Sequence, residues 1–326
     1  MMPSFEYVRA KSVDEAIKHL AIRNAKVHAG GTDLLGCMRD RIFSVERIVS
    51  IQGIKGLSGI DETSEGMTIG SLTTITQIAA SPIVARLFPG LAIAAGEVAS
   101  PQLRNQGTIG GNLCQKPRCW YYRGEFDCMR KGGITCYAVA GENKFHCVLG
   151  GDNCFMVHPS DTAPMLIAFG ASLVVKGPKG TRRIAVENLY VNPSDDPQRE
   201  TVLEPGEIIT EIVIPKTAGR HYSSYRKIRA RQSWDFALAG IALAFQFDGR
   251  RVLRARVTLS GAAPVPWRSK EVEEVITGRS LDRITIARAA SVVMKQSKPL
   301  SQNEYKISLF EAVMKEELER AANRAS

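Results

Sequence analysis

Short apolar runs, each followed by residues at helical spacing, occupy the first two thirds of the chain. Runs rich in β-branched residues predict strands, and apolar residues three and four apart predict helices. The predicted strands are Phe5–Val8, Lys26–Ala29, Ile48–Ile51, Met67–Ile69, Ala171–Lys176, Arg182–Ala185 and Ile208–Ile214. The predicted helices are Ser12–Leu20, which opens with the capping-box pair Ser12 and Glu15, Leu34–Met38, Leu91–Ala99 and Thr162–Phe169. The stretch Gly70–Ala80 is predicted to be a strand end that leads into a helix.

The pattern changes at a predicted boundary, Pro215–Gly219. Longer alternating runs follow, joined by a tight Asp-Gly-Arg turn, and helical spacing returns near the end of the chain. The runs are Ser223–Arg231, Phe236–Phe247 and Val252–Ser260, and the helices are Glu271–Ile276, Ile284–Lys295 and Tyr305–Ala322. We therefore expect an α+β fold with two domains, 1–216 and 217–326, the second built on a small antiparallel sheet.

The composition is that of an ordinary globular protein, with 44% hydrophobic and 23% charged residues. No run of about 18 apolar residues and no signal-peptide pattern occurs, so we expect no membrane span and a cytoplasmic location. Most of the net charge of +10 comes from the stretch that begins at Thr217, which contains 20 basic and 11 acidic residues. These charges are scattered over predicted helices. This distribution favours a surface that faces solvent or a partner protein, and we expect no nucleic-acid binding.

Two glycine-rich segments are candidates for holding a phosphate. Ala29–Leu34 (AGGTDL) joins a predicted strand to a helix, where free backbone N–H groups favour an anion. A second segment, Gly107–Asn112 (GTIGGN), follows later and lacks the spacing of a Rossmann fingerprint. The two segments are interpreted either as unrelated tight turns or as two grips on the phosphates of one extended dinucleotide.

Six of the seven cysteines lie between Cys114 and Cys154. Their spacing matches neither paired zinc knuckles nor compact ferredoxin runs, but four thiolates can hold either zinc or an iron–sulfur cluster. At this point the cysteines are interpreted as ligands of zinc, as ligands of an iron–sulfur cluster, or as free thiols. The cations among them that could offset a negative centre are Lys116, Arg118, Arg123, Arg130 and Lys131. Asp161, which follows, is interpreted either as a helix N-cap or as an acceptor for cofactor hydroxyls.

Taken together, the motifs AGGTDLL, QLRNQGTIGGNL, HPSDTAP and YRKIRARQSWDFALA resemble, in order, the FAD-binding medium subunits of molybdenum hydroxylases. The resemblance spans nearly the whole chain. It implies a two-lobed FAD-binding domain of the PCMH (vanillyl-alcohol oxidase-like) type, with lobes at 1–53 and 54–216 and a cysteine-rich insertion at 114–157. The residues implied to contact FAD are Ala29, Gly30, Gly31, Thr32, Asp33, Leu34, Ser100, Gly107, Thr108, Gly110, Gly111, Asn112, Asp161 and Lys227. Lys227 would share one strand face with Arg229 and Arg231.

The cysteine pattern looks like the branch of this family that carries an extra [4Fe–4S] cluster. The implied ligands are Cys119, Cys128, Cys136 and Cys154, with Cys114 and Cys147 as alternates. The resemblance implies electron relay between a molybdenum-cofactor large subunit, a [2Fe–2S] small subunit and an external carrier such as ferredoxin, NAD, quinone or oxygen. It implies no catalytic residue on this chain. The alternatives are a stand-alone flavoprotein and a zinc-stabilised binding protein, and periplasmic export with a signal-bearing partner is the alternative location.

Overall fold

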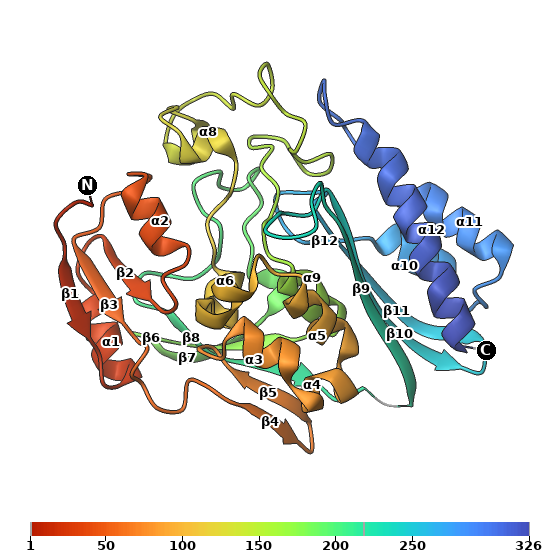
Figure 1. Ribbon diagram of the computed structural model, residues 1–326, viewed down its shortest axis with the longest axis horizontal. Helices are drawn as coiled ribbons and strands as arrows, with labels where there is room; N and C mark the ends of the chain where they lie inside the picture. Colours follow the sequence, from red (N-terminus) through yellow and green to blue (C-terminus); the bar gives the residue numbers. More distant parts are fainter. Residues whose placement is uncertain (1, 218, 326) are drawn as a thin grey trace.

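The computed structural model describes residues 2–217 and 219–325 as three β-sheets with helices packed against them (Figure 1). Positions 1, 218 and 326, which the predicted domain spans include, lie outside the described residues. The fold has the predicted α+β class, with an antiparallel sheet near the C-terminus. Within the described ranges, no helix combines the length and the apolar character that a membrane crossing requires.

The first sheet contains three parallel strands in the order β1-β3-β2. Its elements are β1 (Glu6–Arg9), α1 (Val13–Leu20), β2 (Ala25–His28), α2 (Leu34–Arg39) and β3 (Arg47–Ser50). Ser12 caps α1 as predicted, because its hydroxyl accepts the N–H of Glu15 at 3.1 Å. The chain leaves the carboxyl end of β2 directly into the first glycine segment, which places that segment at one edge of the sheet.

The second sheet is antiparallel with the order β4-β5-β8-β6-β7. Its strands are β4 (Ile60–Thr63), β5 (Gly66–Gly70), β6 (Ser172–Gly177), β7 (Gly180–Ala185) and β8 (Ile208–Pro215). Alternate residues such as Ile69, Leu173 and Ile212 are fully buried in the main core. The accompanying helices are α3 (Ile75–Ala80), α4 (Pro82–Leu87), α5 (Pro89–Gly96), α6 (Pro101–Gln106), α7 (Ile109–Leu113), α9 (Thr162–Ala168) and the 3₁₀ turn η2 (Val186–Asn188). The short helix α7 lies where the sequence predicts only a glycine loop.

The third sheet has the order β12-β11-β10-β9 and carries three helices on one face (Figure 1). Its elements are β9 (Arg220–Ile228), β10 (Ala239–Asp248), β11 (Arg251–Ser260), β12 (Trp267–Arg268), α10 (Lys270–Ile276), α11 (Arg283–Val292) and α12 (Tyr305–Ala325). Along β10, Ile241 and Leu243 pack toward these helices, whereas Ala242 joins the core of the second sheet. Strand β10 is therefore buried on both faces.

Two predicted strands are shorter than the sequence suggests. The run Ser223–Arg231 ends as a strand at Ile228, and the run Phe236–Phe247 begins as one only at Ala239. The chain turns between them, with Trp234 in the left-handed region at φ 53°. Arg229 and Arg231 therefore lie in a loop and do not continue the strand face of Lys227.

The cysteine-rich segment, residues 114–157, rises as a long irregular excursion above the helices (Figure 1). Its regular elements are α8 (Trp120–Arg123) and the 3₁₀ turn η1 (Met129–Lys131). The segment is tied to α12 and the loop before it: the Asn143 backbone N–H donates to Gln302 at 3.1 Å, and the buried Lys306 ammonium donates to the Phe145 carbonyl at 3.3 Å. The segment therefore packs against the C-terminal helix.

Candidate functional site

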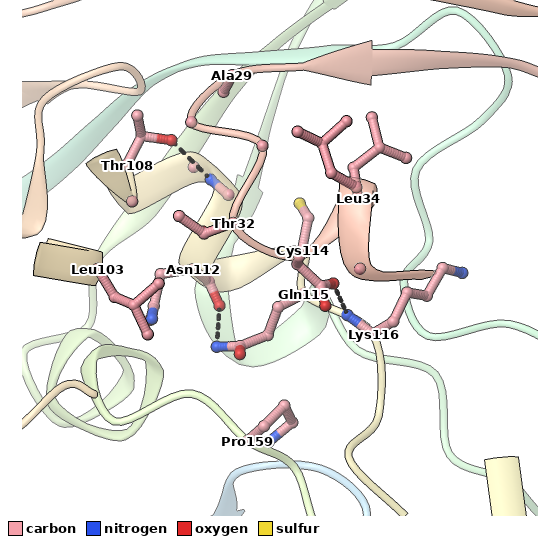
Figure 2. Close-up of a pocket in the computed structure, with 18 of the residues that line it drawn as sticks. Ala29, Thr32, Leu34, Leu103, Thr108, Asn112, Cys114, Gln115, Lys116 and Pro159 are labelled. Atoms are coloured by element: carbon pink, nitrogen blue, oxygen red, sulfur yellow. Dashed lines mark hydrogen bonds between the residues drawn. The ribbon is translucent and has the colours of Figure 1, made fainter. Parts of the chain in front are cut away.

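A cavity of about 800 Å³ opens where the first glycine segment meets α6 and α7 (Figure 2). This large cavity falls within the size range of small-molecule sites, about 300–1,000 Å³. Twelve of the fourteen predicted FAD contacts line it: Ala29, Gly30, Gly31, Thr32, Asp33, Leu34, Gly107, Thr108, Gly110, Gly111, Asn112 and Asp161. Ser100 and Lys227 are absent from the lining. The structure thus brings both glycine segments and the residue Asp161 to one site.

The two glycine segments touch each other at Gly30. A Cβ at this position would lie 1.9 Å from the carbonyl oxygen of Gln106, a distance that no side chain tolerates. Gly31 has φ +72°, which disfavours any other residue there. Glycine at these two positions therefore allows a close backbone contact and a left-handed turn, and together they form one wall of the cavity.

The polar side chains of the second glycine segment hold its backbone in place. The Thr108 hydroxyl accepts the N–H of Gly111 at 3.2 Å, a bond drawn in Figure 2. The Asn112 amide oxygen accepts hydrogen bonds from the hydroxyls of Ser160 at 2.6 Å and Thr162 at 2.7 Å. These bonds join the segment to the start of α9.

Ser71 is a site residue that the sequence analysis missed. Ser71 lines the large cavity just after the end of β5 and is 3% exposed. Its hydroxyl has no hydrogen-bond partner within the described part of the chain. A buried hydroxyl without a partner is unfavourable. Ser71 is therefore available to a polar ligand in this cavity.

Asp161 makes buried contacts with the third sheet. Its carboxylate accepts from the Lys227 ammonium at 2.7 Å and from the Tyr225 hydroxyl at 2.8 Å. Burial raises the pKa of Asp161, and the Lys227 charge opposes that rise. The N-cap interpretation fails, because the Asp161 side chain makes no capping bond and Ser160 accepts the N–H of Ala163 at 3.0 Å instead. Lys227 thus contacts the lining residue Asp161 without itself lining the large cavity.

Asp33 joins the large cavity to the cysteine-rich segment. Its carboxylate accepts the N–H of Lys116 at 2.7 Å and the guanidinium of Arg123 at 2.7 Å, and Arg118 lies 3.0 Å away. Asp33 therefore lines the cavity with a carboxylate that is already paired. Ser100 accepts the N–H of Leu103 at 3.4 Å as the cap of α6, which accounts for its position outside the lining.

A second, small cavity, called here the thiol cavity, is lined by the four predicted ligands Cys119, Cys128, Cys136 and Cys154. Burial raises the pKa of Cys119 to about 12 and also raises the pKa of Cys136, which favours the protonated form of both thiols. Among the described residues, no group of three or more histidine, cysteine or acidic side chains is arranged to hold a single metal ion. The predicted cluster is therefore not confirmed.

The two alternate cysteines lie elsewhere. Cys114 lines the large cavity, and Cys147 is fully buried outside both cavities. His146, which the sequence analysis did not single out, approaches Cys119 with its Nε2 atom 3.3 Å from the sulfur. The folded loop brings His146 next to Cys119, and no pattern in the sequence indicates this contact.

The chain matches two protein-family models. Residues 3–217 match the FAD binding domain in molybdopterin dehydrogenase, and residues 198–321 match the CO dehydrogenase flavoprotein C-terminal domain. It is 32% identical to the aldehyde oxidoreductase FAD-binding subunit PaoB of Escherichia coli K12, over 99% of this chain and 100% of the relative. It is 28% identical to the carbon monoxide dehydrogenase medium chain of Hydrogenophaga pseudoflava, over 99% and 97%.

Solved structures give the same relationship. A chain of the cyanide-inactivated Cu,Mo carbon monoxide dehydrogenase aligns with a TM-score of 0.79 and 26% identity, covering 99% of both chains. Reconstituted carbon monoxide dehydrogenase from Oligotropha carboxidovorans aligns with a TM-score of 0.79 and 25% identity, again over 99% of both. The predicted fold, a FAD-binding domain followed by this C-terminal domain, is thereby confirmed.

Proposed function

The chain belongs to the family of FAD-binding medium subunits of the multisubunit molybdenum hydroxylases, which are oxidoreductases, and we propose that it carries both FAD and a [4Fe–4S] cluster. One observation supports this pairing most strongly. The stretch from Asn112 to Arg123 lines the large cavity, the same segment contributes four cysteines to the thiol cavity, and the chain returns to the large cavity at Pro159 and Asp161. The two cavities are thus built by one continuous segment.

The large cavity fits an extended dinucleotide. The backbone at Gly30 and Gly107 approaches without side chains, which suits close contact with a diphosphate. The Ser71 hydroxyl is buried and unpartnered there, so it is ready to bond a cofactor oxygen. When bound, FAD supplies a centre that exchanges one or two electrons and so links one-electron clusters to two-electron acceptors.

The thiol cavity contains the donor set of a cluster held by four thiolates. Cys119, Cys128, Cys136 and Cys154 supply the four soft donors that a [4Fe–4S] cluster requires. We therefore infer that the chain transfers electrons, and that a molybdenum-cofactor large subunit converts the substrate, with a [2Fe–2S] small subunit and an external carrier as further partners.

Cysteine variants test the cluster. After anaerobic reconstitution with iron and sulfide, the full chain should bind about four iron atoms, and Cys119→Ser should lose most of them. Cys147→Ala is the matched control: this thiol is buried in the same segment but outside the thiol cavity, so the iron content should be retained. Equal iron loss in both variants, with circular dichroism unchanged, would count against the assigned ligands.

Capture of partners tests the assignment as a subunit. The tagged chain, expressed in its native host, should retain a molybdenum-containing chain and a [2Fe–2S] chain on an affinity column. Substrate turnover by the isolated chain would favour a stand-alone flavoprotein instead. A colourless protein that binds zinc at the thiol cavity would favour a zinc-stabilised binding protein.

A further inference from the structure

Six lysines and arginines lie between Cys114 and Cys154, and five of them, including the exposed Lys144, lie outside the lining of the thiol cavity. Lys116 pairs with Glu200, Arg118 and Arg123 pair with Asp33, and Lys131 donates to the Gly124 carbonyl at 2.7 Å. Of the six, all within the described part of the chain, Arg130 alone lines the thiol cavity.

The Arg130 guanidinium is buried and only partly satisfied. Its side chain is 1% exposed, and Nη1 donates to the Glu200 carboxylate at 3.2 Å and to the Arg199 carbonyl at 3.4 Å. The atoms Nε and Nη2 have no hydrogen-bond partner among the described residues. Since an arginine keeps its charge in any protein environment, two charged donors stay unsatisfied inside the protein.

The charges around Arg130 do not balance. Glu200 is shared between Arg130 and Lys116, so one carboxylate faces two cations. On its cavity side, Arg130 has the sulfur of Cys154 as a neighbour. The place where a further negative charge is missing is therefore the thiol cavity itself.

We propose that Arg130 is the buried counter-ion of the [4Fe–4S] cluster, with its free Nε and Nη2 donors directed at the cluster's sulfur atoms. This inference rests on the proposed function. A four-thiolate cluster carries a negative charge that grows on reduction, and a fixed positive charge with hydrogen bonds to sulfur favours the more negative state. Arg130 therefore raises the reduction potential of the cluster.

The test is a mediator titration of the reconstituted full chain, followed by electron paramagnetic resonance. Arg130→Gln should shift the midpoint potential of the cluster to a lower value, and Arg130→Lys, which keeps the charge, should lie between that variant and wild type. Lys131→Gln is the matched control: it removes the same charge one residue away, outside the thiol cavity, and should leave the potential unchanged.

Iron analysis separates this inference from the proposed function. A wild-type chain without about four iron atoms contradicts the proposed cluster itself. If the wild type binds iron but Arg130→Gln does not, the counter-ion role predicts that Arg130→Lys restores the cluster. The inference is overturned if Arg130→Gln matches wild type in both iron content and potential, or if Arg130→Lys is no closer to wild type than Arg130→Gln.

Discussion

The Asp33 carboxylate and the Arg123 guanidinium lie 2.7 Å apart, and this contact fastens the first glycine segment to the cysteine-rich segment. Arg123 also donates to the sulfur of Cys37 at 2.9 Å, so α8 is held against α2 by two bonds. The ion pair is partly buried, with the two side chains 18% and 15% exposed. A change at Asp33 should therefore affect both cavities.

Asp33→Asn should destabilise the chain by about 1–3 kcal/mol, because it leaves the partly buried Arg118 and Arg123 without their carboxylate. Chemical denaturation measures this loss, and limited proteolysis should cut the segment 114–157 faster. Glu62→Gln breaks an exposed ion pair with Arg86 and serves as the control, with an expected change below about 1 kcal/mol. Equal effects of the two changes would contradict the fastening role.

Gly30→Ala should abolish FAD binding, because the added Cβ would collide with the Gln106 carbonyl and push the two glycine segments apart. The measurement is the flavin content of the purified protein. Gly53→Ala is the control, since a Cβ there meets open space and the residue lies outside the large cavity. Normal flavin content in Gly30→Ala would show that the cofactor does not depend on this wall.

Folding stability should fall in mild acid because of His158. Burial lowers the pKa of His158 to about 3, from an ordinary value of 6.5. Between these two pH values the unfolded chain binds a proton at His158 that the folded chain excludes. The contribution of neutral His158 to folding stability is therefore fully present above pH 6.5 and decreases as the pH falls. The loss from this residue alone should be about 2 kcal/mol at about pH 5.

His158→Asn provides the comparison. The side-chain oxygen of the introduced asparagine can accept the N–H of Ser160, as His158 Nδ1 does at 3.4 Å, but it does not titrate. Denaturant unfolding of the two proteins across this pH range should give a flatter curve for the variant. Parallel curves would refute the role of His158.

Leu243→Ala should cost about 2–5 kcal/mol, because Leu243 is fully buried between β10 and the C-terminal helices. Leu253, on β11 of the same sheet, is 44% exposed, so Leu253→Ala should cost less than about 1 kcal/mol. Thermal or chemical unfolding measures both. A small effect at Leu243 would mean that this sheet face packs loosely.

The strands of the third sheet could be predicted because local signals agree with the fold. Alternating apolar residues and the tight turn at Asp248 predict β10 and β11, and both strands form. The short helix α7 was missed because its glycines disfavour helix, yet Thr108 caps it. The sequence pattern also did not predict that the strand containing Lys227 ends at Ile228. The turn at Trp234 interrupts the alternating pattern there.

The sequence motifs predict only part of the candidate site. Both glycine segments and the four cysteines gather as the sequence suggests. The orphan hydroxyl of Ser71 and the free donors of Arg130 depend on contacts between segments far apart in the chain. No periodicity or spacing signals such contacts, so only the folded structure could identify them.

The most direct test of the central claim is the content of FAD, iron, sulfide and zinc in the wild-type full chain after anaerobic reconstitution. The account predicts bound FAD with about four iron atoms and about four sulfides per chain, and a paramagnetic signal that appears on reduction. Zinc in place of iron, or a chain that binds FAD but no iron, would contradict it.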